Sequence, residues 1–162
     1  MKSNLKIFAI LLIVTVFTFL LWKMEEGASG DLSSEVTTDF AIADTSLVTK
    51  IFIAGTDGES ALLERSSDTR FWTLNGKHLA RKDATDLLLK TFARAEVKGA
   101  VPELQRSTVI RNFSGSGKKV EIYLGDDKLE KTWYIGTATP SHTGTYMLLE
   151  TPEDGKSEEP FV

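Results

Sequence analysis

The sequence contains no cysteine in its 162 residues. This absence excludes disulfide bonds, thiolate zinc sites, a cysteine nucleophile and lipid attachment to an N-terminal cysteine. Histidine is scarce as well, because only His78 and His142 occur. A zinc site would need the fold to bring both histidines together with carboxylates. We therefore predict no metal site.

Clustered positive charge is also missing. Of the 19 lysines and arginines, Lys2, Lys6 and Lys23 flank an apolar run near the N-terminus, and all 23 acidic residues follow that run. The rest of the chain carries 16 basic and 23 acidic residues, a net charge of −7. Nucleic-acid binding needs clustered lysine and arginine, whereas here these residues are interspersed with acids. The sequence predicts no nucleic-acid partner.

One long hydrophobic run is present, at residues 7–22, which carry no charge. With two flanking residues it would form a helix of about 27 Å, close to the thickness of a hydrocarbon core of about 30 Å. Lys2 and Lys6 precede the run, and Glu25 and Glu26 follow it. By the positive-inside rule, the N-terminus is predicted to be cytoplasmic and the remainder to lie outside the cell membrane.

The run is interpreted as a retained anchor because it is longer than the roughly 7–15 residues of a signal-peptide core. The alternative is a secreted domain, released by cleavage near Gly30 after the small residues Ala28 and Ser29. The predicted division is a cytoplasmic stub with a transmembrane anchor at 1–22, a flexible acidic linker at 23–39, and an extracytoplasmic domain at 40–162.

The domain begins with strand patterns. Alternating apolar residues on either side of Asp57 and Gly58 predict a β-hairpin. Asn75 and Gly76 predict a second turn, which the aromatic segment 71–74 enters and a short return arm leaves.

Two helical patterns follow. The first has Asp83 as its N-cap and Gly99 as its stop. Its apolar stripe comprises Ala84, Leu87, Leu88, Thr91, Phe92 and Ala95. The second covers 103–113, and three further strands are expected at 120–124, 129–135 and 145–150. The predicted fold is α+β, an antiparallel sheet in the order β-β-β-α-α-β-β-β with both helices on one face, preceded by one transmembrane helix.

Several motifs resemble functional sites only superficially. Residues 114–118 (Ser-Gly-Ser-Gly-Lys) lack the spacing of a phosphate-binding loop and leave a helix rather than enter one. Ser141 and His142 could join Asp126 or Asp127 as a hydrolytic triad, but no G-x-S-x-G elbow is present. The acidic residues near Gly155 lack the alternating order of a calcium loop. We predict no catalytic residue and no cofactor.

The C-terminal tail turns from an acidic stretch to Phe161 and Val162. These two residues are expected either to make a short contact with a sheet edge or to begin a strand of a longer parent protein.

Five segments together resemble the domain of unknown function 4340 family across residues 40–162. They are Val48-Thr49-Lys50-Ile51, Trp72-Thr73-Leu74-Asn75-Gly76, Leu87-Leu88, Lys119-Val120-Glu121-Ile122-Tyr123, and Tyr134-Ile135-Gly136 followed by Thr143-Gly144-Thr145-Tyr146-Met147-Leu148. The resemblance implies a membrane-anchored protein of the bacterial envelope, and some relatives accompany ABC-type transport or gliding-type components. It implies no catalytic residue. Many members continue beyond the position of Val162.

The loop at 136–145 has the densest run of hydroxyls and glycines and is predicted to be a partner- or ligand-contact loop. Its contact candidates are Thr137, Thr139, Ser141, His142, Thr143, Thr145 and Tyr146. The alternative is an ordinary exposed hairpin connection. The expected function is a non-enzymatic, protein-binding accessory component of an envelope transport or assembly complex. The other functions considered are a small-ligand or polysaccharide binder, which an exposed Trp72 or Trp133 would mark, and a hydrolase that uses His142.

Overall fold

The computed structural model describes residues 40–66 and 71–162. The predicted anchor at 1–22, the linker at 23–39 and the alternative cleavage near Gly30 lie outside the described residues. Within the described part of the chain, no helix has both the length and the apolar character needed to cross a membrane.

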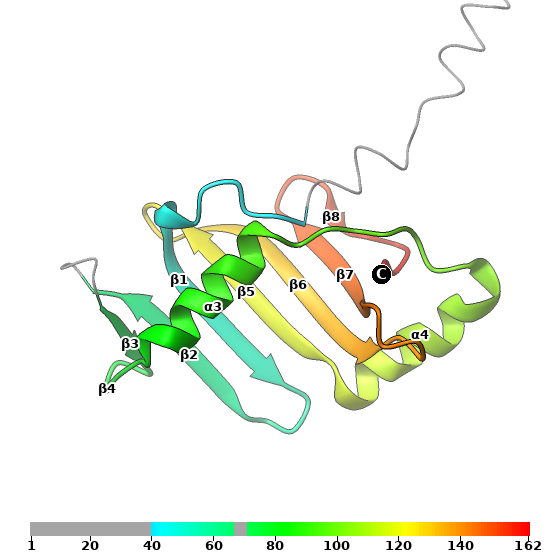
Figure 1. Ribbon diagram of the computed structural model, residues 1–162, viewed down its shortest axis with the longest axis horizontal. Coiled ribbons are helices and arrows are strands. Elements are labelled where there is room, and N and C mark those ends of the chain that lie inside the picture. The colour runs from blue at the N-terminus through cyan, green and yellow to red at the C-terminus, as the bar shows by residue number, and fades with distance from the viewer. Residues whose placement is uncertain (1–39, 67–70) are drawn as a thin grey trace, which may run out of the picture. The chain divides into compact units, whose positions relative to one another are not determined.

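One antiparallel sheet of eight strands forms the centre of the domain, in the order β4-β3-β2-β1-β5-β6-β7-β8 (Figure 1). The strands are β1 Val48–Gly55, β2 Ser60–Arg65, β3 Trp72–Leu74, β4 His78–Leu79, β5 Lys118–Leu124, β6 Lys128–Ala138, β7 Thr145–Thr151 and β8 Gly155–Lys156. A 3-10 turn, η1 Thr45–Leu47, precedes β1. Two four-stranded meanders therefore meet where β1 pairs with β5.

The α+β class and the antiparallel pairing are confirmed, but the predicted order of elements is wrong. In the chain, four strands rather than three precede the two helices, and four rather than three follow them. The order was incomplete because β4 and β8 have two residues each, which is too short for an alternating apolar pattern. Turn chemistry did locate the arm that becomes β4. Asn75 and Gly76 have φ values of 52° and 65°, as a type I′ turn requires.

The first helix, α3 Lys82–Ala93, differs from the prediction at both ends and in the face that it buries. Asp83 lies inside the first turn, with Arg81 at the N-cap. The helix ends six residues before Gly99, and Gly99 instead accepts a hydrogen bond from the N–H of Val162 at 3.0 Å. The residues that face the core are Thr85, Leu88, Leu89 and Phe92. Leu87, which the predicted stripe placed in the core, is 65% exposed.

The second helix, α4 Glu103–Ser116, begins where predicted and ends three residues later than expected. Gly117 closes it, and its backbone N–H donates to the carbonyl of Phe113 at 2.9 Å. A Cβ atom on Gly117 would lie 2.4 Å from that carbonyl oxygen. Only glycine therefore allows the chain to turn from α4 directly into β5.

The two helices cover opposite faces of the sheet, so the prediction of helices on one face is wrong. Trp133 and Tyr134 are neighbours on β6 and point to opposite faces. Phe92 of α3 packs edge-on against Trp133, with ring centroids 5.1 Å apart. Phe113 of α4 instead lines a small cavity together with Tyr134 and lies against Gly136. The segment 94–102 carries the chain around the β7 side of the sheet between the two helices (Figure 1).

The C-terminal residues complete that side of the sheet. Phe161 pairs with Met147 of β7, and Ala100 of the connecting segment pairs with Phe161. The N–H of Val101 donates to the carbonyl of Pro160 at 2.8 Å, and that of Lys98 donates to the carbonyl of Val162 at 2.6 Å. Phe161 therefore makes the sheet contact that was one of the two alternatives for the terminal dipeptide, while Val162 pairs with the segment after α3.

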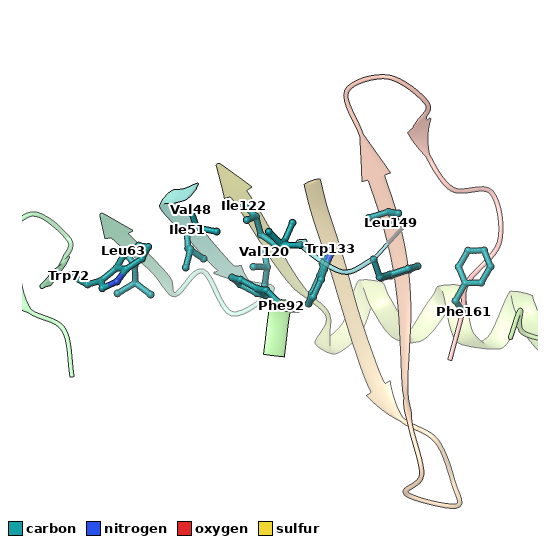
Figure 2. Packing of buried hydrophobic residues seen from close by; sticks show 12 residues of the cluster. Val48, Ile51, Leu63, Trp72, Phe92, Val120, Ile122, Trp133, Leu149 and Phe161 are labelled. Carbon is teal, nitrogen blue, oxygen red and sulfur yellow. The ribbon is translucent and has the colours of Figure 1, made fainter. Parts of the chain in front are cut away.

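The hydrophobic core lies between α3 and the sheet, with Trp133 in the middle of a row of side chains that runs from Trp72 to Phe161 (Figure 2). Phe40 closes the core, with its ring centroid 6.2 Å from Trp133 and 5.8 Å from Phe161. The N–H of Ile42 donates to the carbonyl of Phe92 at 2.9 Å. The segment that begins the described domain is thus part of its core.

The sheet face opposite α3 carries a ladder of tyrosines, carboxylates and lysines. The hydroxyl of Tyr123 donates to Glu121 at 2.7 Å, and that of Tyr134 donates to Glu150 at 2.6 Å. The ammonium of Lys156 lies 3.7 Å from the ring centroid of Tyr134. The hydrogen bond to Glu121, followed by burial, raises the pKa of Tyr123 from 10.0 to about 12. Burial, followed by the hydrogen bond to Glu150, raises the pKa of Tyr134 to about 12.

The hydroxyls of Tyr123 and Tyr134 should ionise at a higher pH in the folded protein than in the unfolded chain. Because both folded-state pKa values exceed the unfolded value, the stability contributed by the two hydroxyls is complete below about pH 10 and is lost as the pH rises towards 12. An absorbance titration at 295 nm of the folded protein should show steps near pH 12. Tyr123→Phe and Tyr134→Phe should each remove one such step. If the step that each variant removes lies near pH 10 instead, the hydrogen bonds of Tyr123 to Glu121 and of Tyr134 to Glu150 would be contradicted.

Candidate functional site

The predicted contact loop is shorter than expected because β6 continues through Thr137 and Ala138. The remaining residues, 139–144, form a tight turn. The N–H of His142 donates to the carbonyl of Thr139, and the N–H of Thr139 donates to the carbonyl of Gly144, each at 2.9 Å. His142 has a φ of 54°, in the left-handed region.

The loop hydroxyls bond mainly to one another. Ser141 Oγ lies 3.2 Å from Thr139 Oγ1 and 2.9 Å from Thr143 Oγ1. Thr139 Oγ1 also donates to the carbonyl of Gly144 at 3.3 Å. Lys98 Nζ donates to the carbonyl of Thr143 and so ties the loop to the segment after α3. The hydroxyls therefore hold the loop in one shape.

This loop forms one wall of a cleft with a volume of about 200 Å³. The residues that line the cleft are Phe40, Thr91, Ala95, Glu96, Val97, Lys98, Trp133, Thr143, Gly144, Thr145, Met147, Phe161 and Val162. They come from the start of the domain, the end of α3, the segment after it, β6, the loop, β7 and the C-terminal residues. The cleft thus exists only because five separate stretches of the chain meet there.

Two of the seven predicted contact residues, Thr143 and Thr145, line this cleft. Thr139 is buried beneath the loop with 7% of its surface exposed. The other four, Thr137, Ser141, His142 and Tyr146, lie outside the cleft lining. The structure therefore places part of the predicted loop in the wall of the cleft. The other predicted contact residues lie beneath the loop or outside the cleft.

The interior of the cleft is mainly apolar, with Trp133, Met147 and Phe161 among its lining side chains, and Glu96 and Lys98 supply charge. Its volume is below the roughly 300–1,000 Å³ typical of sites for drug-sized ligands. An engineered apolar cavity of about 150 Å³ is large enough for benzene. The cleft therefore matches the size of one large apolar side chain.

Gly144 allows the loop to approach the C-terminal residues closely. A Cβ atom at this position would lie 2.5 Å from Cγ1 of Val162. Gly144 lies within the predicted loop but was not among its contact candidates. Sequence patterns did not identify Ala95, Val97 or Met147 as site residues, because nothing distinguishes them from their neighbours in the segment after α3 or in β7. No local signal could have found them, since the cleft depends on contacts between distant parts of the chain.

The hydrolytic triad considered from the sequence is not assembled. The imidazole of His142 is exposed and forms no hydrogen bond with any described residue, while Ser141 bonds to threonine hydroxyls. Asp127 lies at the opposite end of the 11-residue β6, about 35 Å away along the strand. There it pairs with Lys50 at 3.0 Å.

The histidines are also far from each other. His78 belongs to β4, and His142 follows β6, which is five strand spacings away in the sheet, or about 24 Å. Among the described residues, no group of three or more histidine, aspartate or glutamate side chains is placed to hold a metal ion. Trp72 and Trp133 are 6% and 2% exposed, so neither provides the exposed indole that would have marked polysaccharide binding.

No protein-family model, curated protein or solved structure matches this chain. The resemblance to the domain of unknown function 4340 family stays a prediction that rests on the five sequence segments.

Proposed function

We propose that this protein is a non-enzymatic, protein-binding accessory component of an envelope transport or assembly complex, held at the outer side of the membrane by residues 7–22. The single observation that carries the binding role is the apolar cleft beside the hydroxyl loop. The location is supported by the uncharged run and by the positions of Lys2 and Lys6 before it.

The cleft has the features of an anchor site for a partner's side chain. Protein interfaces concentrate their binding energy in a few large side chains that enter desolvated pockets with a surrounding polar rim. Here an apolar interior of one-side-chain size lies beside the hydrogen-bonded loop and near Lys98. Because the hydroxyls of Thr139, Ser141 and Thr143 form hydrogen bonds with one another, the loop is suited to presenting a fixed binding surface rather than to catalysis.

The cleft can be blocked by one substitution. Ala95 lines it, so Ala95→Trp should fill much of its volume. Ala93→Trp is the matched control, because Ala93 is exposed and lies two residues away. With the full-length chain purified in a mild detergent, wild type and the control should retain a stoichiometric partner. Ala95→Trp should retain at least about tenfold less, a loss of about 1.4 kcal/mol.

Circular dichroism and thermal melts should first show that both variants are folded. Equal partner recovery with Ala95→Trp and wild type would exclude the cleft as the binding site. A monomer without a stoichiometric partner in every detergent would contradict the protein-binding function itself.

A further inference from the structure

The turn between β3 and β4 contains a pair of residues that can react with each other. Asn75 is the one asparagine of the chain that glycine follows. Because Gly76 has no side chain, its backbone nitrogen is unhindered and its dihedral angles change easily. A five-membered ring forms when this nitrogen reaches the side-chain amide carbon of Asn75. Both residues are exposed, so water and hydroxide reach them.

The fold binds both the backbone and the side chain of Asn75 to one residue of β2. The N–H of Asn75 donates to the carbonyl of Leu62 at 2.7 Å, and the N–H of Leu62 donates to Oδ1 of Asn75 at 2.8 Å. The side-chain carbonyl thereby takes the place of a backbone carbonyl and extends the register of β2 and β3 by one pair. The orientation of the amide is therefore fixed by the sheet.

The turn also keeps the nitrogen of Gly76 away from that amide. Asn75 and Gly76 have φ values of 52° and 65°. The N–H of Lys77 closes the turn by donating to the carbonyl of Leu74 at 3.2 Å. A type I′ turn of this kind sets ψ of Asn75 at about 30°, which places the nitrogen of Gly76 almost opposite Cβ of Asn75 about the Cα–C bond. Ring closure needs this nitrogen and Cβ on the same side, so the folded turn excludes the reaction.

We propose that Asn75 is a covalent modification site that is unreactive in the folded hairpin and reacts whenever the β3–β4 hairpin opens. Hydroxide removes the proton from the nitrogen of Gly76, and this nitrogen forms a bond with Cγ of Asn75. The bond from Cγ to the side-chain nitrogen breaks, and the leaving group takes a proton from water and departs as ammonia, which regenerates hydroxide. Water then opens the cyclic imide at either carbonyl and gives aspartate or isoaspartate. The net reaction consumes water, releases ammonia and needs no oxidant.

The two products differ in their effect on the hairpin. Aspartate keeps the main chain unchanged, and its carboxylate can accept the N–H of Leu62 as the amide does. Isoaspartate carries the main chain through Cβ, which lengthens the turn by one atom. Because β4 has only two residues, its pairing with β3 depends on the shape of this turn. A chain whose hairpin has opened is thus marked covalently, independently of the proposed binding role.

Peptide mapping tests whether the folded hairpin protects Asn75. The full chain is incubated at mildly alkaline pH with and without guanidinium chloride. Trypsin then releases residues 71–77 as one peptide, in which mass spectrometry detects loss of the amide and chromatography separates isoaspartate from aspartate. Conversion in the folded protein should be at least about tenfold slower than in guanidinium chloride, because the reaction needs the hairpin to open. Equal rates in the two conditions would overturn the proposal.

Two truncations distinguish opening of the hairpin from unfolding of the whole domain. Leu74 precedes Asn75 on β3 and Ile135 lies on β6, and both side chains are partly buried against the core. Each folded-state rate is divided by the rate of the same variant in guanidinium chloride. Leu74→Ala should raise this ratio at least about threefold over wild type, whereas Ile135→Ala should leave it within about twofold. An equal rise in both variants, or no rise in Leu74→Ala, would overturn the role of the hairpin.

Discussion

Trp133→Ala is expected to lower the free energy of unfolding by about 3–5 kcal/mol. The indole is 2% exposed and packs between Phe92 of α3 and Phe40 at the start of the domain. Its removal would leave a cavity where α3, β6 and the segment at 40–42 meet. Because domains of this size are stable by about 5–15 kcal/mol, the variant should unfold at a much lower urea concentration, measured by circular dichroism.

Trp133→Phe is the matched control. The indole Nε1 is buried and has no hydrogen-bond partner among the described residues. Phenylalanine keeps most of the apolar contact and removes a donor whose burial without an acceptor is costly. Its free energy of unfolding should therefore stay within about 1.5 kcal/mol of the wild type. A loss as large as that of Trp133→Ala would mean that the second ring of the indole, rather than aromatic packing as such, supplies most of the stabilisation at this site.

Phe161→Ala is expected to have the second large effect, a loss of about 3–4 kcal/mol. Phe161 is 4% exposed, contacts Phe40, and pairs through its backbone with Met147 and Ala100. The loss of its ring would weaken the core and the packing of the C-terminal segment over β7. The midpoint of urea unfolding measures the change, with an unchanged slope if unfolding stays two-state.

Leu104→Ala provides the comparison for Phe161→Ala. Leu104 lies in the first turn of α4 and is 96% exposed. Its truncation to alanine should therefore change the free energy of unfolding by about 0.5 kcal/mol or less. Equal effects of the two substitutions would mean that Phe161 does not pack in the core in solution.

Local sequence signals predicted the strands and turns well. The turn at Asn75 and Gly76 was identified because two consecutive left-handed residues favour this pair of residue types. The alternation that defines β1, β2, β5, β6 and β7 was also visible, since each strand has one face towards the core. These signals depend on neighbouring residues only, and a single sequence contains them.

The face of α3 was predicted less well. Leu88 and Phe92 were correctly placed in the core, but the stripe also included Ala84, Leu87 and Thr91, which are exposed. Helical periodicity identifies the apolar side of a helix. When the apolar stripe is wider than the surface that packs on the sheet, however, periodicity does not tell which part of the stripe is buried. The strands beneath α3 and the segment around Phe40 decide that orientation, and they are distant in the sequence.

The loop at 136–145 was likewise predicted only in part. Its polar composition indicated a connection at the surface, and two of its residues, Thr143 and Thr145, do line the cleft. Its hydroxyl network joins residues that are close in the sequence, whereas its contact with Lys98 and its place beside the cleft depend on distant parts of the chain.

The sequence by itself determined the α+β class, the antiparallel pairing signals, the main turns and the absence of cysteine chemistry. Only the tertiary structure decided that α3 and α4 cover opposite faces and that an apolar cleft forms at the end of α3. The physical reason is the range of the interactions. Turns and periodic elements arise from contacts within a few residues, whereas the cleft needs Phe40, Ala95, Trp133, Thr145 and Phe161 to meet.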